Sequence, residues 1–284
     1  MQSLKKIDYL KNNVAMIKDK FICPICNSDI NIINNSLRCE NNHTFDFSNK
    51  GYFVFYKTSK IKNSKIYDTD LFVHRRNFIN YGFYEELHNL ISKIINKKEN
   101  TDLILDLGCG EATHDKNILE KIDNRSSKII GVDISKDGIK MASDYVNNNI
   151  IPIVLDLNNL PFKSESVDII IDILSPSNEK EIKKVLKKDG IIIKVTPKRK
   201  YLYELREIYE IDDYKNEGDI DNNIRNNYNI IEKIEFEKTY NLNEKQLEEL
   251  INMTPLLKSR IKSNKINLNH ITISLNIYVL SVKE

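Results

Sequence analysis

Three cysteines and a histidine lie close together near the start of this sequence. Cys23, Cys26, Cys39 and His43 follow the pattern C-x2-C-x12-C-x3-H, in which a short loop separates two close pairs. Such pairs can converge on one tetrahedral Zn²⁺ ion, for which thiolate and imidazole are suitable ligands. Four protein ligands leave no open position for a substrate water, which indicates a structural zinc site. The alternatives are buried cysteines without a metal, or a disulfide with one spare thiol.

A glycine-containing turn between a strand and a helix is the second motif. The apolar run L-I-L-D-L is typical of a buried parallel strand, and it leads through Gly108-x-Gly110 into a predicted helix. Glycines at such a turn let the backbone approach a ligand beside the positive end of the helix. Asp133 ends a second apolar strand, at the position where doubly wound folds bind ribose hydroxyls.

The same turn distinguishes between two classes of nucleotide cofactor. A dinucleotide site requires Gly or Ala at the end of G-x-G-x-x-G/A, and Thr113 occupies that position here. Asp106 precedes the first glycine by two residues, and this D-x-G-x-G pattern resembles motif I of the Rossmann-like S-adenosylmethionine methyltransferases. Many members of that class have a third glycine where this chain has Ala112. A turn without a ligand, and a nicotinamide site, are the alternatives.

The elements that would position these residues alternate along the chain. The patterns predict helices over 113–121, 179–187, 202–209 and 244–253. They predict strands over 103–107, 128–133, 150–156, 166–173, 191–195, 230–240 and 270–282. This β-α-β-α-β order with a final antiparallel pair predicts an α/β fold: a Rossmann-like S-adenosylmethionine-dependent methyltransferase domain with a seven-stranded sheet, preceded by a small N-terminal zinc-binding module.

The expected domain organisation has four parts. They are an N-terminal extension over 1–20, a zinc-binding module over 21–60, a helical connector over 61–100 and a methyltransferase domain over 101–284. A polar, basic linker over 57–65 would join the module to the connector. The chain has no long apolar run and no secretory core, so we expect no membrane contact. Reduced cysteines in a zinc site are typical of a cytoplasmic protein.

Two basic clusters indicate a polyanionic partner, although the net charge is only +2. The first 65 residues hold eleven Lys or Arg against five Asp or Glu, and the lysines over 50–65 have no acid among them. A second cluster spans 183–200. Basic stripes of this kind can follow a phosphate backbone. A solvated lysine face is the alternative for each cluster.

Further motifs follow the zinc pattern along the chain. The zinc pattern is followed by H-T-F-D-F-S-N-K-G-Y, and the connector contains D-x4-R-R-x-F-x3-G-x-Y, ending at Tyr84. Others are Gly131-Val-Asp-Ile-Ser135, Leu160-Pro-Phe162, Val195-Thr-Pro197 and Met253-Thr-Pro255. With these motifs the chain as a whole resembles the RlmA/TlrB family of 23S rRNA guanine-N1 methyltransferases, which act on a hairpin loop at the peptide-exit tunnel. The zinc module and the connector are not general methyltransferase features, so together these matches are specific.

The resemblance implies roles for individual positions. The methionine part of S-adenosyl-L-methionine would lie along Gly108, Gly110 and Glu111, with the ribose on Asp133 and the adenine edge beside Asp156. The other implied cofactor-binding residues are Tyr84, Asp106, Leu157 and Tyr201. Tyr201 stands where family members have a histidine that contacts the cofactor. For both tyrosines the alternative is a core aromatic ring whose hydroxyl is satisfied within the protein.

The implied reaction transfers a methyl group to N1 of a guanosine in a 23S rRNA hairpin loop, with the zinc module aiding RNA recognition. Catalysis would consist mostly of positioning, and a general base for the N1 proton would help. The sequence identifies no such base, and Asp172 is one candidate among others. A methyltransferase of small molecules or proteins with the zinc module as a lid is an alternative, as is a cofactor-binding subunit without activity. A homodimer is compatible with the sequence.

Overall fold

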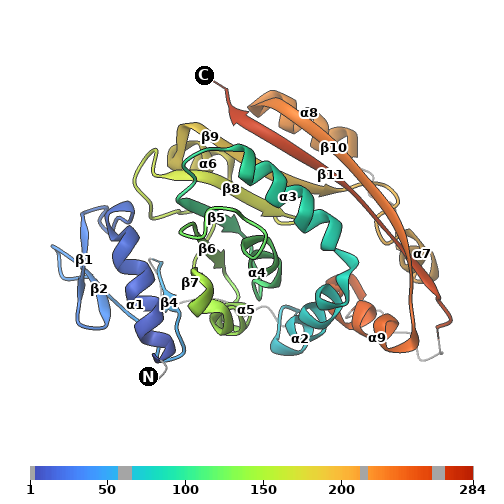
Figure 1. Cartoon of the computed structure of the whole chain (residues 1–284), viewed down its shortest axis with the longest axis horizontal. Coiled ribbons are helices and arrows are strands. Elements are labelled where there is room, and N and C mark those ends of the chain that lie inside the picture. The colour runs from blue at the N-terminus through green and yellow to red at the C-terminus, as the bar shows by residue number, and fades with distance from the viewer. Residues whose placement is uncertain (1–3, 57–65, 212–216, 258–265, 284) are drawn as a thin grey trace.

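The computed structural model describes residues 4–56, 66–211, 217–257 and 266–283, and within them a mixed sheet of eight strands forms the centre of the molecule (Figure 1). The two strands at one edge, β10 and β11, are antiparallel, and the other six run parallel. In spatial order the strands are β10 (Tyr228–Asn241), β11 (His270–Val282), β9 (Leu186–Pro197), β8 (Val167–Ile173), β5 (Leu103–Leu107), β6 (Lys128–Asp133), β7 (Ile150–Val154) and β4 (Phe53–Val54).

The sheet has one strand more than the seven expected. Seven strands of the described chain come from the methyltransferase domain, and the eighth, β4, comes from the zinc-binding module. It pairs in parallel with β7, with Phe53 opposite Ile153 and Val54 opposite Val154. The hydrophobic pattern of the sequence does not predict β4, because an alternation of apolar and polar residues cannot be recognised in a strand of two residues.

Strands β5, β6, β7, β8 and β11 are buried on both faces, and their side chains alternate between two hydrophobic cores, whereas most residues of the edge strand β10 are exposed or half-buried. Leu105, for example, faces a core shared with α1, α6, α8 and the zinc-binding module, whereas Ile104 faces a core shared with α3, α4, α7 and α9. The helices are α1 (Lys6–Ile17), α2 (Thr69–Phe78), α3 (Glu85–Lys97), α4 (Thr113–Leu119), α5 (Lys136–Ala142), α6 (Glu179–Val185), α7 (Tyr203–Ile208), α8 (Glu217–Asn227) and α9 (Glu244–Met253).

The predicted helical connector over 61–100 contains two helices, α2 and α3. A π-helical turn, Ile79–Phe83, separates them, and Gly82 in that turn has φ +89°. A residue with a side chain is strained in this left-handed region, so glycine is suited to the kink. Turns of this kind are frequent at functional sites. Here the turn directs the chain so that Tyr84 precedes α3 and its ring enters the protein interior.

The zinc-binding module lies at one end of the molecule, opposite the antiparallel pair of strands β10 and β11 (Figure 1). It contains a three-stranded antiparallel sheet of β1 (Ile30–Ile33), β2 (Ser36–Cys39) and β3 (Thr44–Asp46). Aromatic rings join it to the large sheet: Phe21 lies 5.2 Å from Phe162 and 5.5 Å from Phe55, measured between ring centroids. The module therefore shares its core with the methyltransferase domain. The predicted linker over 57–65 lies outside the described residues.

Helix α5 packs its glycine directly against the turn that follows β5. A Cβ atom on Gly138 would lie 2.9 Å from the carbonyl oxygen of Gly110 and 2.9 Å from the ring of Phe72. We expect Gly138→Ala to lower the free energy of unfolding by about 1–3 kcal/mol, because the backbone must shift to accept the methyl group. Denaturant unfolding monitored by circular dichroism measures the change.

The matched control is Gly218→Ala in α8, where no atom lies within 4 Å of the added Cβ. This change should stabilise the protein by up to about 1 kcal/mol through helix propensity. Equal effects of the two substitutions would contradict the close packing of α5 against Gly110.

Candidate active site and zinc centre

A cavity of about 570 Å³ opens at the carboxyl ends of the parallel strands. Loops after β5, β6, β7 and β8 contribute to its wall, together with α2, the start of α3 and the segment after α9. Ligands of open α/β sheets bind outside the carboxyl ends of the strands, so the position is the expected one. Of the nine residues predicted to bind a cofactor, seven line this cavity: Tyr84, Gly108, Glu111, Asp133, Asp156, Leu157 and Tyr201.

The turn after β5 brings the backbone close to its neighbours. Gly108 has φ +81° and Gly110 has φ +58°, and a Cβ atom on Gly108 would lie 2.0 Å from the side-chain oxygen of Ser175. Glycine at position 108 therefore lets the loop after β8 come up against the turn. Ala112, at the third-glycine position, also has a positive φ of +61°, which costs about 1 kcal/mol or more for a residue with a Cβ.

Asp133 connects the turn after β5 with the end of β6. One carboxylate oxygen accepts a hydrogen bond from the Gly110 N–H at 3.0 Å, and the other accepts from the Ser135 N–H at 2.7 Å. Burial raises the pKa of Asp133, and these backbone hydrogen bonds act in the opposite direction. Each carboxylate oxygen has a further lone pair, so the group can still accept from a ligand hydroxyl.

Buried carboxyl groups without partners surround the turn. The Oδ1 atom of Asp106, the Oε1 atom of Glu111 and both carboxyl oxygens of Asp115 have no hydrogen-bond partner among the described residues. Burial raises the pKa of all three carboxyl groups. Glu111 lines the cavity, whereas Asp106 lies behind the turn. The orphaned oxygen of Glu111 favours a ligand that brings N–H, O–H or positive charge, whereas the carboxyl groups of Asp106 and Asp115 interact with each other when one is protonated.

Three side chains from distant parts of the chain, Tyr84, His114 and Tyr201, meet at the wall of the cavity, and His88 lies behind His114. The hydroxyl groups of Tyr84 and Tyr201 are 2.7 Å apart, and the Tyr84 ring packs edge-on against His114. The Nδ1 atom of His114 lies 2.8 Å from the Nε2 atom of His88. Burial lowers the pKa of His88 to about 4 and that of His114 well below its usual value. Both imidazoles are therefore neutral at pH 7.

Asp156 and Leu157 follow β7 and line the outer part of the cavity. The carboxylate of Asp156 accepts from the backbone and the side chain of Asn158, at 2.9 and 3.0 Å. These bonds fix the carboxylate at the rim, where it is exposed. Leu157 is half-buried beside it and offers an apolar surface.

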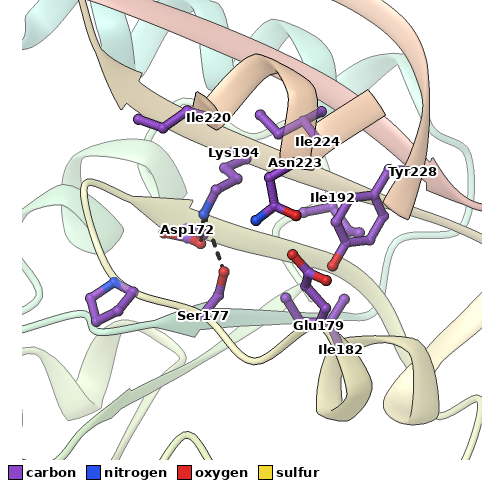
Figure 2. Close-up of a pocket in the computed structure, with 11 residues that line it drawn as sticks. Asp172, Ser177, Glu179, Ile182, Ile192, Lys194, Ile220, Asn223, Ile224 and Tyr228 are labelled. Atoms are coloured by element: carbon purple, nitrogen blue, oxygen red, sulfur yellow. Dashed lines mark hydrogen bonds and ion pairs between the residues drawn. The ribbon is translucent and has the colours of Figure 1, made fainter. Parts of the chain in front are cut away.

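Asp172 lies apart from this cavity. It lines a second, smaller cavity, forms an ion pair with Lys194 and accepts from the Ser175 N–H at 3.2 Å (Figure 2). Successive strand residues point to opposite faces of a sheet, so Ile173 faces the larger cavity and Asp172 does not. This geometry does not favour Asp172 as a group that touches the reacting atoms.

Several residues that line the larger cavity were not among the predicted cofactor-binding residues. Among them are Arg75, His114, Ile134, Leu174, Ser175 and the segment from Met253 to Pro255. Arg75 and the Met253 segment did belong to motifs of the family resemblance, which was the available signal. His114 follows the glycine turn directly. Leu174 has φ +56°, and a bulky residue in this region often marks a functional site, but the sequence shows no backbone angle.

The four predicted zinc ligands come together at the end of the small module. Their ligand atoms all lie within 4.8 Å of one another. The Cys26 and Cys39 sulfurs are 3.7 Å apart, and the Nδ1 atom of His43 is 3.3 Å from the Cys39 sulfur and 3.6 Å from that of Cys23. A tetrahedral zinc with its usual bond lengths separates its ligand atoms by about 3.4–3.8 Å. The donor set and spacing therefore fit zinc.

The second basic cluster is largely neutralised. Lys184 pairs with Glu181, Lys187 with Asp168 and Lys194 with Asp172, and further pairs join the end of β9 to acids on β10. The surface over 183–200 therefore does not form a continuous basic stripe. Of the first stripe, the lysines over 57–65 lie outside the described residues.

No helix in the described part of the chain is both long and apolar enough to cross a membrane.

Comparison with known proteins places the chain in a family. Residues 98–252 match a family model described as a methyltransferase domain, and residues 21–60 match one described as "RlmA, N-terminal". Among solved structures, a chain in the complex of the Haloferax volcanii Trm112 methyltransferase activator with a methyltransferase is 14% identical with a TM-score of 0.50. That match covers 79% of this chain and 100% of the other, and it shows the fold alone.

Two relatives carry the family assignment further. The YxjB protein of Bacillus subtilis (strain 168), whose name assigns it to the 23S rRNA (guanine-N1) methyltransferases, is 35% identical over 255 residues, which is 85% of this chain and 88% of that protein. The 23S rRNA (guanine(748)-N1)-methyltransferase of Streptomyces fradiae is 26% identical over 64% of this chain and 65% of its own length. The chain therefore belongs to the RlmA/TlrB family of 23S rRNA (guanine-N1) methyltransferases.

Proposed function

We propose that this protein transfers a methyl group from S-adenosylmethionine to N1 of a guanosine in a hairpin loop of 23S rRNA. The observation that carries the proposal is the combination, in one chain, of the cavity around Asp133 with a Cys₃His cluster in the small module. The names of the two relatives support the RNA substrate, and they disfavour a small molecule or a protein as acceptor. Ribosomal RNA as substrate implies a cytoplasmic location.

The cavity contains acceptor groups that S-adenosylmethionine could satisfy with its own hydrogen-bond donors and positive charge. Glu111 presents a buried oxygen without a partner, and Asp133 keeps acceptor capacity at the end of β6. We propose that Gly108, Gly110 and Glu111 hold the methionine part, Asp133 the ribose, and Asp156 with Leu157 the adenine. Tyr84 and Tyr201 would close the inner end, with Asp106 fixing the turn from behind. When bound, S-adenosylmethionine supplies an electrophilic methyl group.

The acceptor base would enter between the mouth of the cavity and the loop after β8. Exposed apolar side chains stand at this mouth, namely Tyr67, Ile134 and Leu174. A base extruded from a hairpin loop can stack on such surfaces, and a loop base costs little to unstack. Gly108 allows Ser175 to approach the turn, so the loop is fixed relative to the cofactor residues.

Positioning would then account for most of the catalysis. Aligning the acceptor nitrogen with the methyl carbon converts a bimolecular encounter into a reaction within one complex. Asp172 is ion-paired with Lys194 in the other cavity, so it is poorly placed to accept the N1 proton. We propose that this proton leaves to solvent at the mouth of the cavity.

Replacing Asp133 tests the cofactor assignment. Asp133→Asn keeps the shape of the side chain but removes its charge and one acceptor. We expect the affinity for S-adenosylmethionine to fall by about 1–3 kcal/mol, because ligand hydroxyls lose a charged partner. Isothermal titration calorimetry measures the change, with Asp123→Asn on the exposed surface as the control. Unchanged affinity in Asp133→Asn would exclude the proposed ribose contact.

Removal of one zinc ligand tests the metal centre. We expect about one zinc per chain in the parent protein and loss of zinc in Cys39→Ser, because a structural site requires all four ligands. Cys109→Ser, which removes a buried thiol outside the cluster, should keep the metal. Elemental analysis gives the stoichiometry, and thermal melting should show a lower Tm only for Cys39→Ser. A metal-free parent protein with an unchanged Tm would end the proposal.

Methyl transfer to RNA tests the reaction itself. A 23S rRNA fragment containing the exit-tunnel hairpin should gain one methyl group, detected as 1-methylguanosine by mass spectrometry and as a stop in reverse transcription. The same fragment with its methylated guanosine replaced by 1-methylguanosine should gain none, because N1 is already substituted. Transfer to a protein or small molecule without any transfer to RNA would replace the proposal with its alternative.

A further inference from the structure

A second cavity, of about 220 Å³, lies behind the loop that follows β8 (Figure 2). Its walls come from β8, β9, α6 and α8. Asp172 lines it, while the next residue, Ile173, lines the cofactor cavity, so the two cavities lie on opposite faces of β8. Pro176 borders both. The loop over 174–178 therefore separates two cavities that open near each other.

A buried hydroxyl group without a partner faces this space. Tyr228 is 5% exposed, and its hydroxyl oxygen has no hydrogen-bond partner within the described part of the chain. Burial raises the pKa of Tyr228, so the hydroxyl group keeps its proton. A buried polar group left without a partner destabilises the folded protein. A ligand that accepts or donates a hydrogen bond there removes this penalty.

Two more polar groups converge with this hydroxyl. Figure 2 shows the carboxylate of Glu179 pointing toward the Tyr228 hydroxyl, and the amide of Asn223 with its oxygen on the Tyr228 side and its nitrogen on the side of Lys194. The Oδ1 atom of Asn223 already accepts from Asn227 at 2.6 Å, so its Nδ2 remains as a donor. The structure gives the Glu179 carboxylate no ion pair or hydrogen bond among the residues it describes. The cavity therefore offers one charged acceptor beside two neutral donors.

The rest of the cavity is apolar or carries a compensated charge. Lys194 is held by Asp172 and by the hydroxyl of Ser177, at 3.1 Å from the latter, so its charge is compensated and does not neutralise Glu179. Ile182, Ile192 and Ile224 supply apolar walls. The volume is below the roughly 300–1,000 Å³ of sites for drug-sized ligands, which suits a single ring system.

We propose that this cavity receives a second nucleobase of the RNA substrate, a guanine close to the methylated nucleotide. The proposal rests on the RNA substrate proposed above. Among the four bases, guanine presents two adjacent N–H donors, at N1 and N2, with an acceptor beside them at O6. The two N–H groups can donate to the Glu179 carboxylate, and O6 can accept from the Tyr228 hydroxyl or from the Nδ2 atom of Asn223. Sequence-specific proteins read loop bases in this way, by their Watson–Crick edges.

The position of the cavity explains how two bases would be held together. When a hairpin loop presents its target base to the cofactor cavity, the neighbouring bases lose their stacking partners. Because Pro176 borders both cavities, a neighbouring nucleotide can pass around the loop over 174–178 and enter the second cavity. The second base would then fix the register of the loop and so decide which guanosine reaches the methyl group.

Two conservative variants test the proposal. Tyr228→Phe removes only the unpartnered oxygen, and we expect KM for the hairpin to rise about 3- to 10-fold, whereas Glu179→Gln should raise it about 10- to 100-fold because a charged acceptor is lost. The KM for S-adenosylmethionine should stay unchanged. Glu232→Gln on β10 is the matched control, because that side chain lines neither cavity.

A substrate series identifies the base independently of protein folding. Hairpins in which each loop guanosine other than the target is replaced in turn by inosine, which lacks the N2 amino group, are methylated by the parent protein. One replacement should lower kcat/KM, and the same replacement should have no further effect in Glu179→Gln. Equal methylation of all inosine hairpins by the parent protein, or unchanged KM in both variants, would overturn the second-base site. Absence of any RNA methylation by the parent would instead overturn the proposed function.

Discussion

The carboxylate of Asp133 is the group on which the geometry of the cofactor cavity depends. It holds the turn after β5 through Gly110 and the loop after β6 through Ser135, at 3.0 and 2.7 Å. Charge-assisted bonds to backbone N–H groups are stronger than neutral ones, and burial shields them from water. On its other side the turn packs against Gly138 of α5. The placement of Glu111, just beyond Gly110, follows from this restraint.

The parts of the structure that could be predicted are those determined by residues that lie close together in the sequence. The zinc ligands were identified because their spacing along the chain is short, and β6, β11 and α9 begin and end at the predicted residues because their apolar patterns and caps are complete. The break at Gly82 and the pairing of β4 depend on packing between distant segments. No local pattern reports such packing. The sequence shows glycine at 82 but not the angle that it adopts.

The same distinction between local and distant residues applies to the side chains that line the cavities. The glycine turn and Asp133 belong to one β-α-β unit and could be located by order alone. The contact between Tyr84 and Tyr201 joins residues 117 positions apart, and only the folded chain brings their hydroxyl groups together. Charge was the least predictable property. Lys187 and Lys194 look like part of a basic surface in the sequence, yet each is paired with a buried acid of β8. The number of charged residues in a segment does not show which of them form ion pairs in the folded chain.

The short strand β4 has a consequence for how this protein can have changed over time. Because it forms one edge of the large sheet, and because Phe21 packs on Phe162, the metal-binding segment covers surface that the catalytic domain would otherwise expose. An exposed parallel edge and an uncovered aromatic cluster would favour association with other chains. The metal-binding segment is therefore not an interchangeable attachment. A chain without this segment would expose both surfaces, so we expect substitutions on one side of the junction to require compensating substitutions on the other.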